Sequence, residues 1–290
     1  MKPPKFRYLR AGGLDEALEA MQTADAKVIA GGQSLVPMLN FRLLRPSLLV
    51  DINRIPGLDQ IEETASGGVR VGALTRHHKI ETSELLKQRC PALAAAVRHI
   101  GHLAIRNRGT IGGSLCHADP AAEHLLMAVL LEAELTVRSA QGSRTIHARD
   151  LVAGALSTTL EAQEILVAVE FPAIAPRTGW GFEEYSRRTG DFALVASAVL
   201  MQTQDGVVSN ARLAVSGGAN GPVRIKRAEA ALRNRALDEA ALDEAVDAVR
   251  ESFEPNADLH ASADLRHHIV GTLIRRTCRT AWQRSLGESA

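Results

Sequence analysis

Two glycine pairs of the same pattern constrain the fold of this chain more than any other feature. The first lies in "VIAGGQSLVP" (28–37) and the second in "TIGGSLCHADP" (110–120), and each pair stands between an apolar run and a serine. Glycine accepts positive φ, so such a pair lets the backbone turn sharply and lets successive N–H groups point one way. Two interpretations fit each pair: a tight turn, or a loop that binds phosphate.

The spacing of the glycines excludes two common nucleotide-binding motifs. Neither loop has the G-x-G-x-x-G pattern of a Rossmann fold, and no G-K-[ST] follows as in a P-loop. Two loops of the same order favour one ligand with two phosphates over two unrelated turns. Asp119 and Glu123 follow the second loop. They fit either hydrogen bonds to ribose hydroxyls or the N-cap and capping box of a helix that starts at Pro120.

The remaining pattern predicts a mixed α+β chain in three parts. Residues 1 to about 55 are expected to form β-α-β-α-β around a small parallel sheet. The next part, to about 175, is expected to contain several helices and a hairpin that turns near Gln141 and Gly142. The segment "PAIAPRTG" (172–179) has linker composition. Beyond it, three strand-like runs begin at Trp180, Phe192 and Val207, and long amphipathic helices follow.

Composition excludes several classes of function. The net charge of +1 has no concentrated basic face, so we expect no nucleic-acid partner. The three cysteines form no CxxC pair for zinc or an iron–sulfur cluster, and their sparse number is typical of a reducing compartment. We therefore expect a cytoplasmic protein. No apolar run reaches the roughly 18 residues of a membrane span.

Catalytic motifs are also missing from the sequence. There is no G-x-S-x-G, and the ten histidines lack metal-binding spacing, so we expect no metal site and no catalytic nucleophile in this chain. The pairs His77–His78 and His267–His268 are expected on helix surfaces.

Four segments resemble a known family. The stretches "AGGQSLVPMLNFRLLRPSLLVDI" (30–52) and "IRNRGTIGGSLCHADPAAE" (105–123) resemble the FAD-binding medium subunit of molybdenum hydroxylases, the carbon monoxide dehydrogenase and xanthine dehydrogenase type. A third segment of that subunit is similar to "YSRRTGDFALVASAV" (185–199), and its C-terminal helix is similar to "ASADLRHHIVGTLIRR" (261–276). The resemblance covers nearly the whole chain in the right order.

The resemblance implies an α+β fold in two domains. Residues 1–175 would form a FAD-binding domain of the vanillyl-alcohol-oxidase (PCMH) type, with subdomains of about 1–55 and 56–175. Residues 176–290 would form a C-terminal flavoprotein domain with a three-stranded antiparallel sheet and a helical bundle. The flavin would lie between the two subdomains and the C-terminal domain.

The resemblance also implies roles for individual residues. Residues 30–35 and 110–114 would hold the FAD diphosphate and its neighbouring groups, Ile105 and Asn107 would lie near the flavin ring or ribityl chain, and Thr75 would approach the cofactor. The complete implied set of cofactor-binding residues is Val28, Ala30, Gly31, Gly32, Gln33, Ser34, Leu35, Thr75, Ile105, Asn107, Gly109, Thr110, Ile111, Gly112, Gly113, Ser114, Ala122, Glu123, Ile165, Leu166, Arg188 and Phe192.

Within this set, Glu123 occupies an acidic position near the adenosine ribose where the family usually has Asp, and Ile165 with Leu166 would flank the adenine. Arg188 and Phe192 would lie close to the flavin. A phenylalanine donates no hydrogen bond, so Phe192 would act by stacking or shielding.

The implied function is that of a FAD-carrying electron-transfer subunit in a heterotrimer. A large subunit with a molybdopterin cofactor would hydroxylate the substrate, and a small subunit with two [2Fe-2S] clusters would pass electrons to the FAD of this chain, for delivery to an external acceptor. By analogy we expect a dimer of heterotrimers. Two alternatives stay open: a stand-alone FAD-dependent oxidoreductase with its own substrate pocket, which would work without partners, and a non-catalytic module that retains no FAD.

Overall fold

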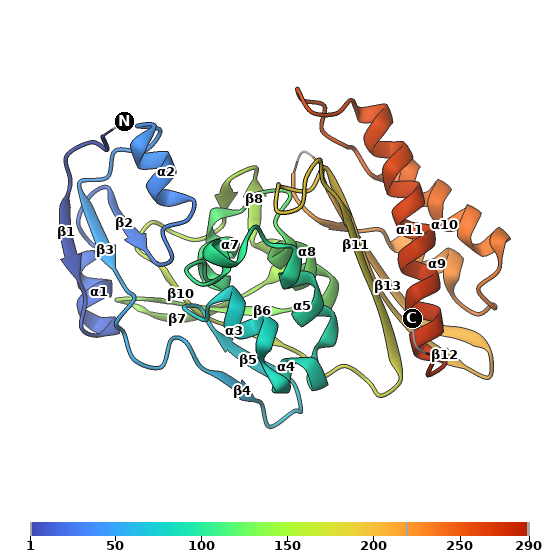
Figure 1. Ribbon diagram of the computed structural model, residues 1–290. Helices are drawn as coiled ribbons and strands as arrows, with labels where there is room; N and C mark the ends of the chain where they lie inside the picture. Colours follow the sequence, from blue (N-terminus) through green and yellow to red (C-terminus); the bar gives the residue numbers. More distant parts are fainter. Residues whose placement is uncertain (1, 219, 289–290) are drawn as a thin grey trace.

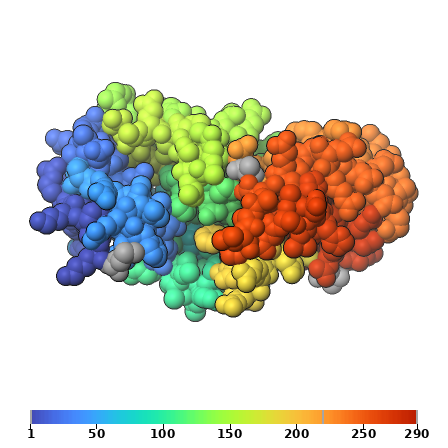
Figure 2. All heavy atoms as spheres, turned by 90° about the horizontal axis from the view of Figure 1, so that it is seen from above, coloured from blue at the N-terminus to red at the C-terminus, as the bar shows by residue number. Residues whose placement is uncertain are grey.

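The computed structural model describes residues 2–218 and 220–288 of the chain. Three units follow one another along the molecule, each built on a sheet (Figure 1). Seen from above, the units form an elongated body that runs from the blue N-terminal unit through the green centre to the orange C-terminal unit (Figure 2).

The N-terminal unit has a three-stranded parallel sheet in the order β1-β3-β2, which confirms the predicted β-α-β-α-β arrangement. A helix between two strands carries the chain back to the starting edge of the sheet, so strands that alternate with helices pair in parallel. Both neighbours of β3 pair with it from Leu48 onward, and β3 is buried along its whole length. The elements are β1 (Arg7–Arg10), α1 (Leu14–Ala20), β2 (Ala26–Ile29), α2 (Leu35–Asn40) and β3 (Leu48–Asp51).

The central unit has a five-stranded antiparallel sheet in the order β4-β5-β10-β6-β7. Ser139 pairs with Gly142, so the predicted hairpin is confirmed. Its strands are β4 (Ile61–Glu63), β5 (Val69–Gly72), β6 (Glu134–Ser139), β7 (Gly142–His147) and β10 (Ile165–Phe171), and a two-stranded ribbon of β8 (Val152–Gly154) and β9 (Ser157–Thr158) lies beside it. On β10, Ile165 packs into the N-terminal core and Leu166 into the central core, because successive side chains point to opposite faces.

Helices between β5 and β6 cover one face of this sheet (Figure 1). The last of them, α8, is buried all around, as the apolar run from Leu125 to Leu131 requires. They are α3 (His77–Thr82), α4 (Glu84–Arg89), α5 (Pro91–Ala96), α6 (Leu103–Arg106), α7 (Ile111–His117) and α8 (Glu123–Leu131), with short 3₁₀ turns at Val97–His99 and, after β7, Ala148–Asp150.

The start of α8 differs from the prediction. Helix α7 ends at Ala118 in the left-handed conformation, with φ of 52°, and the next residues form a turn in which Asp119 Oδ1 accepts from the Ala121 N–H at 2.9 Å. The helix therefore begins at Glu123 rather than at Pro120. Asp119 is not its N-cap, and Glu123 is not in a capping box.

The C-terminal unit has an antiparallel sheet in the order β11-β12-β13-β14, one strand more than predicted. The extra strand has two residues, too few to show a period in the sequence. Glycines let α11 lie against β11, since a Cβ at Gly181 would stand 2.2 Å from the Thr277 carbonyl oxygen. The elements are β11 (Thr178–Tyr185), β12 (Val195–Gln204), β13 (Val207–Ser216), β14 (Val223–Arg224), α9 (Lys226–Leu232), α10 (Glu239–Ser252) and α11 (Ala263–Ser285).

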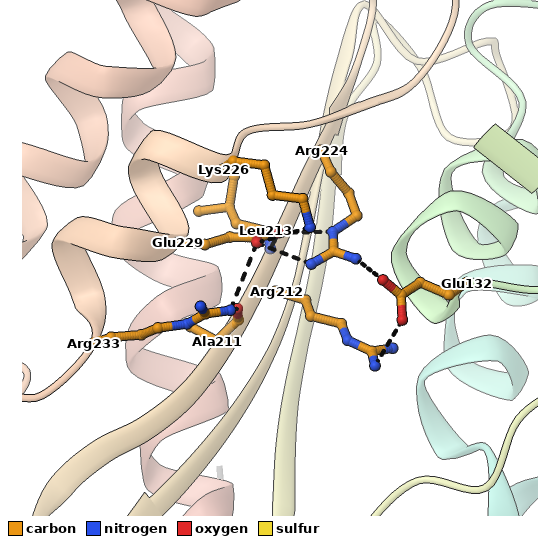
Figure 3. Close-up of polar contacts among 8 residues, drawn as sticks. All are labelled: Glu132, Ala211, Arg212, Leu213, Arg224, Lys226, Glu229 and Arg233. Carbon is orange, nitrogen blue, oxygen red and sulfur yellow. Dashed lines mark hydrogen bonds and ion pairs between the residues drawn. The ribbon is translucent and has the colours of Figure 1, made fainter. Parts of the chain in front are cut away.

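The C-terminal sheet packs on the central unit through its other face, where Ala196, Ala198 and Leu200 join the central core. An ion network reinforces this boundary (Figure 3). Glu132, just after α8, pairs with Arg212 at 2.8 Å and with Arg224, which in turn holds the buried Glu229 at 2.7 Å. None of the helices described is both long and apolar enough to cross a membrane.

Candidate cofactor-binding site

The first glycine loop joins β2 to α2 and turns at Gly32, whose φ is +73°. The N–H groups of residues 31–34 donate to no acceptor in the part of the chain that the structure describes. Consecutive donors of this kind, beside a residue with positive φ, form a concave site for an anion. The geometry therefore fits the phosphate-binding interpretation of this loop.

The two glycine loops are in direct backbone contact. A Cβ atom on Gly31 would lie 2.3 Å from the Arg108 carbonyl oxygen and 2.8 Å from the Gly109 Cα. Only glycine permits this approach. The fold thus brings together two segments that are about 80 positions apart in the sequence.

The second loop differs from the prediction because it forms the first turn of α7. Thr110 is the N-cap, and its Oγ1 accepts from the Gly113 N–H at 3.0 Å. The Ile111 and Gly112 N–H groups donate to the Thr75 and Ala73 carbonyls at 3.1 and 2.9 Å. These donors are already used, so the second loop offers no second set of free N–H groups for a phosphate.

The second glycine pair also has a packing role. A Cβ on Gly112 would stand 2.6 Å from the Ala73 Cβ, so glycine lets α7 lie on the end of β5. Thr75 is fully buried, and its carbonyl holds this helix in place. The groups near the loop that remain available to a ligand are the exposed side chains of Asn107 and Arg108 and the partly exposed Ser114.

Asn53 and Arg76 connect the loops, and the sequence reasoning missed both. Asn53 Nδ2 donates to the Ala30 carbonyl at 2.8 Å, and Arg76 Nη2 donates to Asn53 Oδ1 at 2.7 Å. Arg76 Nη1 donates to the carbonyl of Arg108. The only sequence signal is position, since Asn53 follows the buried strand β3 and Arg76 follows the predicted Thr75.

The residues assigned to the adenosine end lie in the interior. Glu123 is 8% exposed, and burial raises the pKa of its carboxyl to about 8, helped by the nearby Glu184 carboxylate of β11. Ile165 and Leu166 are buried where β10 begins, and Ala122 is the N-cap residue of α8. These residues come from α8, its N-cap position and β10, and they lie at the boundary of the units.

The residues assigned to the flavin end come from the central and the C-terminal units. Arg188 and Phe192 lie on the loop between β11 and β12, where Phe192 is 68% exposed. Gly190 of that loop rests on the ring of His102, which directly precedes α6. The helix that carries Ile105 therefore begins beside the C-terminal loop, and Asn107 stands at the other end of that helix.

A buried histidine pair supports the second loop. His77 is 4% exposed, so the expected surface position is wrong for this residue, and its Nδ1 lies 3.0 Å from Nε2 of the buried His124. Burial, with the charges of Arg76 and Arg106, lowers the pKa of His77 to about 4. A Cβ on Gly109 would stand 2.4 Å from His77 Nε2, so the neutral ring fills the space beneath that glycine.

No group of three or more His, Cys, Asp or Glu side chains gathers as metal ligands within residues 2–218 and 220–288. The site so described is a loop with free N–H donors against a second glycine segment, bordered by carboxylate, aliphatic and aromatic side chains from the central and C-terminal units.

Comparisons with known proteins match both domains of the chain. Residues 4–174 match the family described as the FAD binding domain in molybdopterin dehydrogenase, and residues 180–281 match the CO dehydrogenase flavoprotein C-terminal domain. The chain is 41% identical to the alpha subunit of the 6-hydroxypseudooxynicotine dehydrogenase complex of Paenarthrobacter nicotinovorans, over 98% of this chain and 97% of that protein.

Solved structures agree with these matches. A chain of carbon monoxide dehydrogenase from Hydrogenophaga pseudoflava superposes with a TM-score of 0.95 at 38% identity, covering 98% of this chain and 99% of that one. A chain of quinoline 2-oxidoreductase from Pseudomonas putida 86 has the same score at 37% identity, covering 99% and 100%. This chain thus belongs to the FAD-binding medium subunits of the molybdenum hydroxylases, the FAD-carrying electron-transfer subunits of the carbon monoxide dehydrogenase and xanthine dehydrogenase type.

Proposed function

We propose that this chain holds one FAD against the two glycine loops, takes electrons from the [2Fe-2S] clusters of a small partner subunit and passes them to an external acceptor. The observation that carries the proposal is the set of free N–H donors at residues 31–34, closed on one side by the second loop. Bound FAD supplies the redox chemistry, and the protein supplies position and electrostatics.

Different residues of the chain bind different parts of the cofactor. The N–H groups after Ala30 donate hydrogen bonds to the diphosphate, and Ser34 adds a hydroxyl donor. Glu123 faces the adenosine ribose, and its raised pKa leaves a protonated carboxyl that donates as well as accepts a hydrogen bond. Ile165 and Leu166, at the start of β10, flank the adenine, with their side chains on opposite faces of the strand.

At the other end of the cofactor, Ile105 and Asn107 approach the ring and ribityl chain from the FAD domain. Arg188 and Phe192 approach from the C-terminal loop. An exposed phenylalanine ring there shields the flavin from water, because an aromatic face covers a large apolar area. The two sides of the ring site thus depend on the docking of the C-terminal domain.

We also propose the finer organisation of the chain: a FAD-binding domain of the vanillyl-alcohol-oxidase type at 1–175, divided near residue 55, and a C-terminal flavoprotein domain at 176–290. Support comes from the separate sheets of the three units and from the two family matches at 4–174 and 180–281. The three cysteines are unpaired, which supports a cytoplasmic location.

The proposed partners are a large molybdopterin subunit, which hydroxylates the substrate, and a small subunit with two [2Fe-2S] clusters, assembled as a dimer of heterotrimers. The substrate would bind in the large subunit. Light scattering after size-exclusion chromatography of the co-expressed complex measures the assembly, and a mass of one trimer would rule out the dimer.

The function itself is tested on the purified full-length chain. We expect a flavin absorbance spectrum and, after heat release, FAD near one per chain. In the co-expressed complex, reduction of this flavin should require the small subunit. A chain that takes up no FAD, alone or in the complex, would refute the proposal. A chain that turns over a substrate without its partners would instead establish a stand-alone oxidoreductase.

A further inference from the structure

Arg76 carries a positive charge without an ionic partner. It stands just before α3, half-buried, and within the described chain neither Arg76 nor Arg108 forms an ion pair. Burial and the neighbouring Arg108 charge lower the pKa of Arg76 by more than the Asp51 and Asp59 carboxylates raise it. Two such guanidinium groups beside the loops leave positive charge for an anion to neutralise.

The hydrogen bonds of Arg76 join the two glycine loops. One arm of its guanidinium donates to the Arg108 carbonyl in the second loop, and the other donates to Asn53 Oδ1 at 2.7 Å. The Asn53 amide continues to the Ala30 carbonyl of the first loop at 2.8 Å. Asn53 is itself fixed, because Asp51 Oδ1 accepts from its Nδ2 at 2.7 Å and from its backbone N–H at 2.9 Å.

The hydrogen bonds of Asn53 and Arg76 determine where the Gly31 N–H points and where the second loop lies. The carbonyl of Ala30 and the N–H of Gly31 belong to one planar trans peptide unit, so they point in opposite directions. The Asn53 amide holds the Ala30 carbonyl, which turns the Gly31 N–H away from Asn53. The hydrogen bond from Arg76 to the Arg108 carbonyl holds the second loop at the backbone contact with Gly31.

We propose that Arg76, acting through Asn53, is a positioning residue that fixes the two glycine loops in the geometry that binds a diphosphate, and that Arg76 and Arg108 together supply its charge compensation. The inference rests on the proposed FAD site. Neither Arg76 nor Asn53 belongs to the set that the family resemblance implies.

A matched control is available next to Arg76. A cavity of about 280 Å³ beside it is lined by Asn53, Arg54, Asp59 and Lys79, among others. Lys79 borders the same cavity, but its ammonium group donates to the Asp59 carbonyl at 2.6 Å and pairs with the Asp59 carboxylate at 3.9 Å. Among the described residues, no hydrogen bond links it to either loop. Lys79→Gln therefore removes one positive charge from the same region and leaves the link between the loops intact.

The test titrates flavin-free full-length chain with FAD and, separately, with ADP. Arg76→Gln and Asn53→Ala should each raise the Kd for both ligands about tenfold or more, as expected when a charge-assisted hydrogen bond is lost. Arg76→Lys keeps the charge but not the two-armed geometry, so it should recover only part of the affinity. Lys79→Gln should bind as the wild type does.

The melting temperature of each flavin-free variant separates positioning from folding. Wild-type affinity for FAD in both Arg76→Gln and Asn53→Ala would overturn the inference and leave the proposed function standing. An equal loss in Lys79→Gln would also overturn it, since net charge alone would then explain the effect. If Arg76→Gln fails to fold, the Kd values of Asn53→Ala and Arg76→Lys test the inference in its place. A wild-type chain without FAD affinity would refute the proposed function and this inference together.

Discussion

The carbonyl oxygen of Arg108 stands 2.3 Å from the position of a Cβ atom on Gly31, so the two glycine loops meet through bare backbone. The first loop presents the free N–H groups, and the second loop is the support against which it rests. The site therefore depends on contact between the loops as well as on the groups that each offers.

Gly31→Ala should abolish FAD retention, because the added methyl group meets backbone that cannot rotate away. Gly13→Ala is the control, since a Cβ there meets nothing within 4 Å and the backbone φ of −150° is open to any residue. Released FAD per chain is the measurement. Full flavin occupancy in Gly31→Ala would show that the loops separate without consequence.

Gly32→Ala tests the turn itself. Gly32 has φ of +73°, and Gly206, on the β12–β13 turn, has φ of +72° with open space around it. An alanine in this region costs about 1–2 kcal/mol at either position. We expect both variants to lose similar stability in urea unfolding, and only Gly32→Ala to lose FAD affinity. Equal FAD affinity in the two variants would mean that the Gly32 turn does not shape the binding loop.

The sequence was sufficient for features that depend on local pattern. Alternation of apolar runs and amphipathic segments predicted the parallel N-terminal sheet, and the turn residues predicted the β6–β7 hairpin. It was insufficient where a pattern admits two structures. The run Ile111–His117 contains a glycine pair and was expected as a loop, yet the Thr110 cap and the packing of Gly112 on Ala73 make it a helix.

In the candidate site, too, some residues could be predicted from the sequence and others could not. The glycine loops were recognisable from residue type and order, whereas Asn53, Arg76 and the His77–His124 pair were not. Their roles arise from contacts between segments distant in the sequence, and a single polar residue after a strand or before a helix carries no such signal. The start of α8 at Glu123, later than the predicted Pro120, likewise depends on one left-handed residue, Ala118.

Glu123 should make stability fall as the pH rises. Burial raises the pKa of this carboxyl from 4.5 to about 8 in the folded chain. Between these values the unfolded state has released the proton and the folded state keeps it, so stability falls by at most about 1.4 kcal/mol per pH unit and levels off above pH 8.

Glu123→Gln removes this titration. In flavin-free protein, its melting temperature relative to wild type should rise between pH 5 and pH 8, whatever fixed cost the amide brings. Glu62→Gln, on the exposed strand β4, is the control and should show no such trend. A constant difference between Glu123→Gln and wild type across this range would contradict a raised pKa.

The ion network between the domains gives a last prediction, which compares two carboxylates on one arginine (Figure 3). Glu229 is 1% exposed and holds Arg224 through two contacts at 2.7 and 2.9 Å, and it also accepts from the Leu213 N–H at 3.1 Å. Glu229→Gln leaves a guanidinium group without its buried partner, so it should cost about 3–5 kcal/mol. Glu132 is half exposed, and Glu132→Gln should cost about 1 kcal/mol or less.

Urea unfolding of both variants measures the difference in their stability cost, and FAD occupancy shows whether docking of the C-terminal domain matters to the site. In the proposed site Arg188 and Phe192 approach the flavin from the docked C-terminal domain, so Glu132→Gln should also weaken FAD binding, by no more than the roughly 1 kcal/mol that it costs the docked state. Unchanged FAD affinity in that variant would show that the domain boundary is held by its apolar core alone.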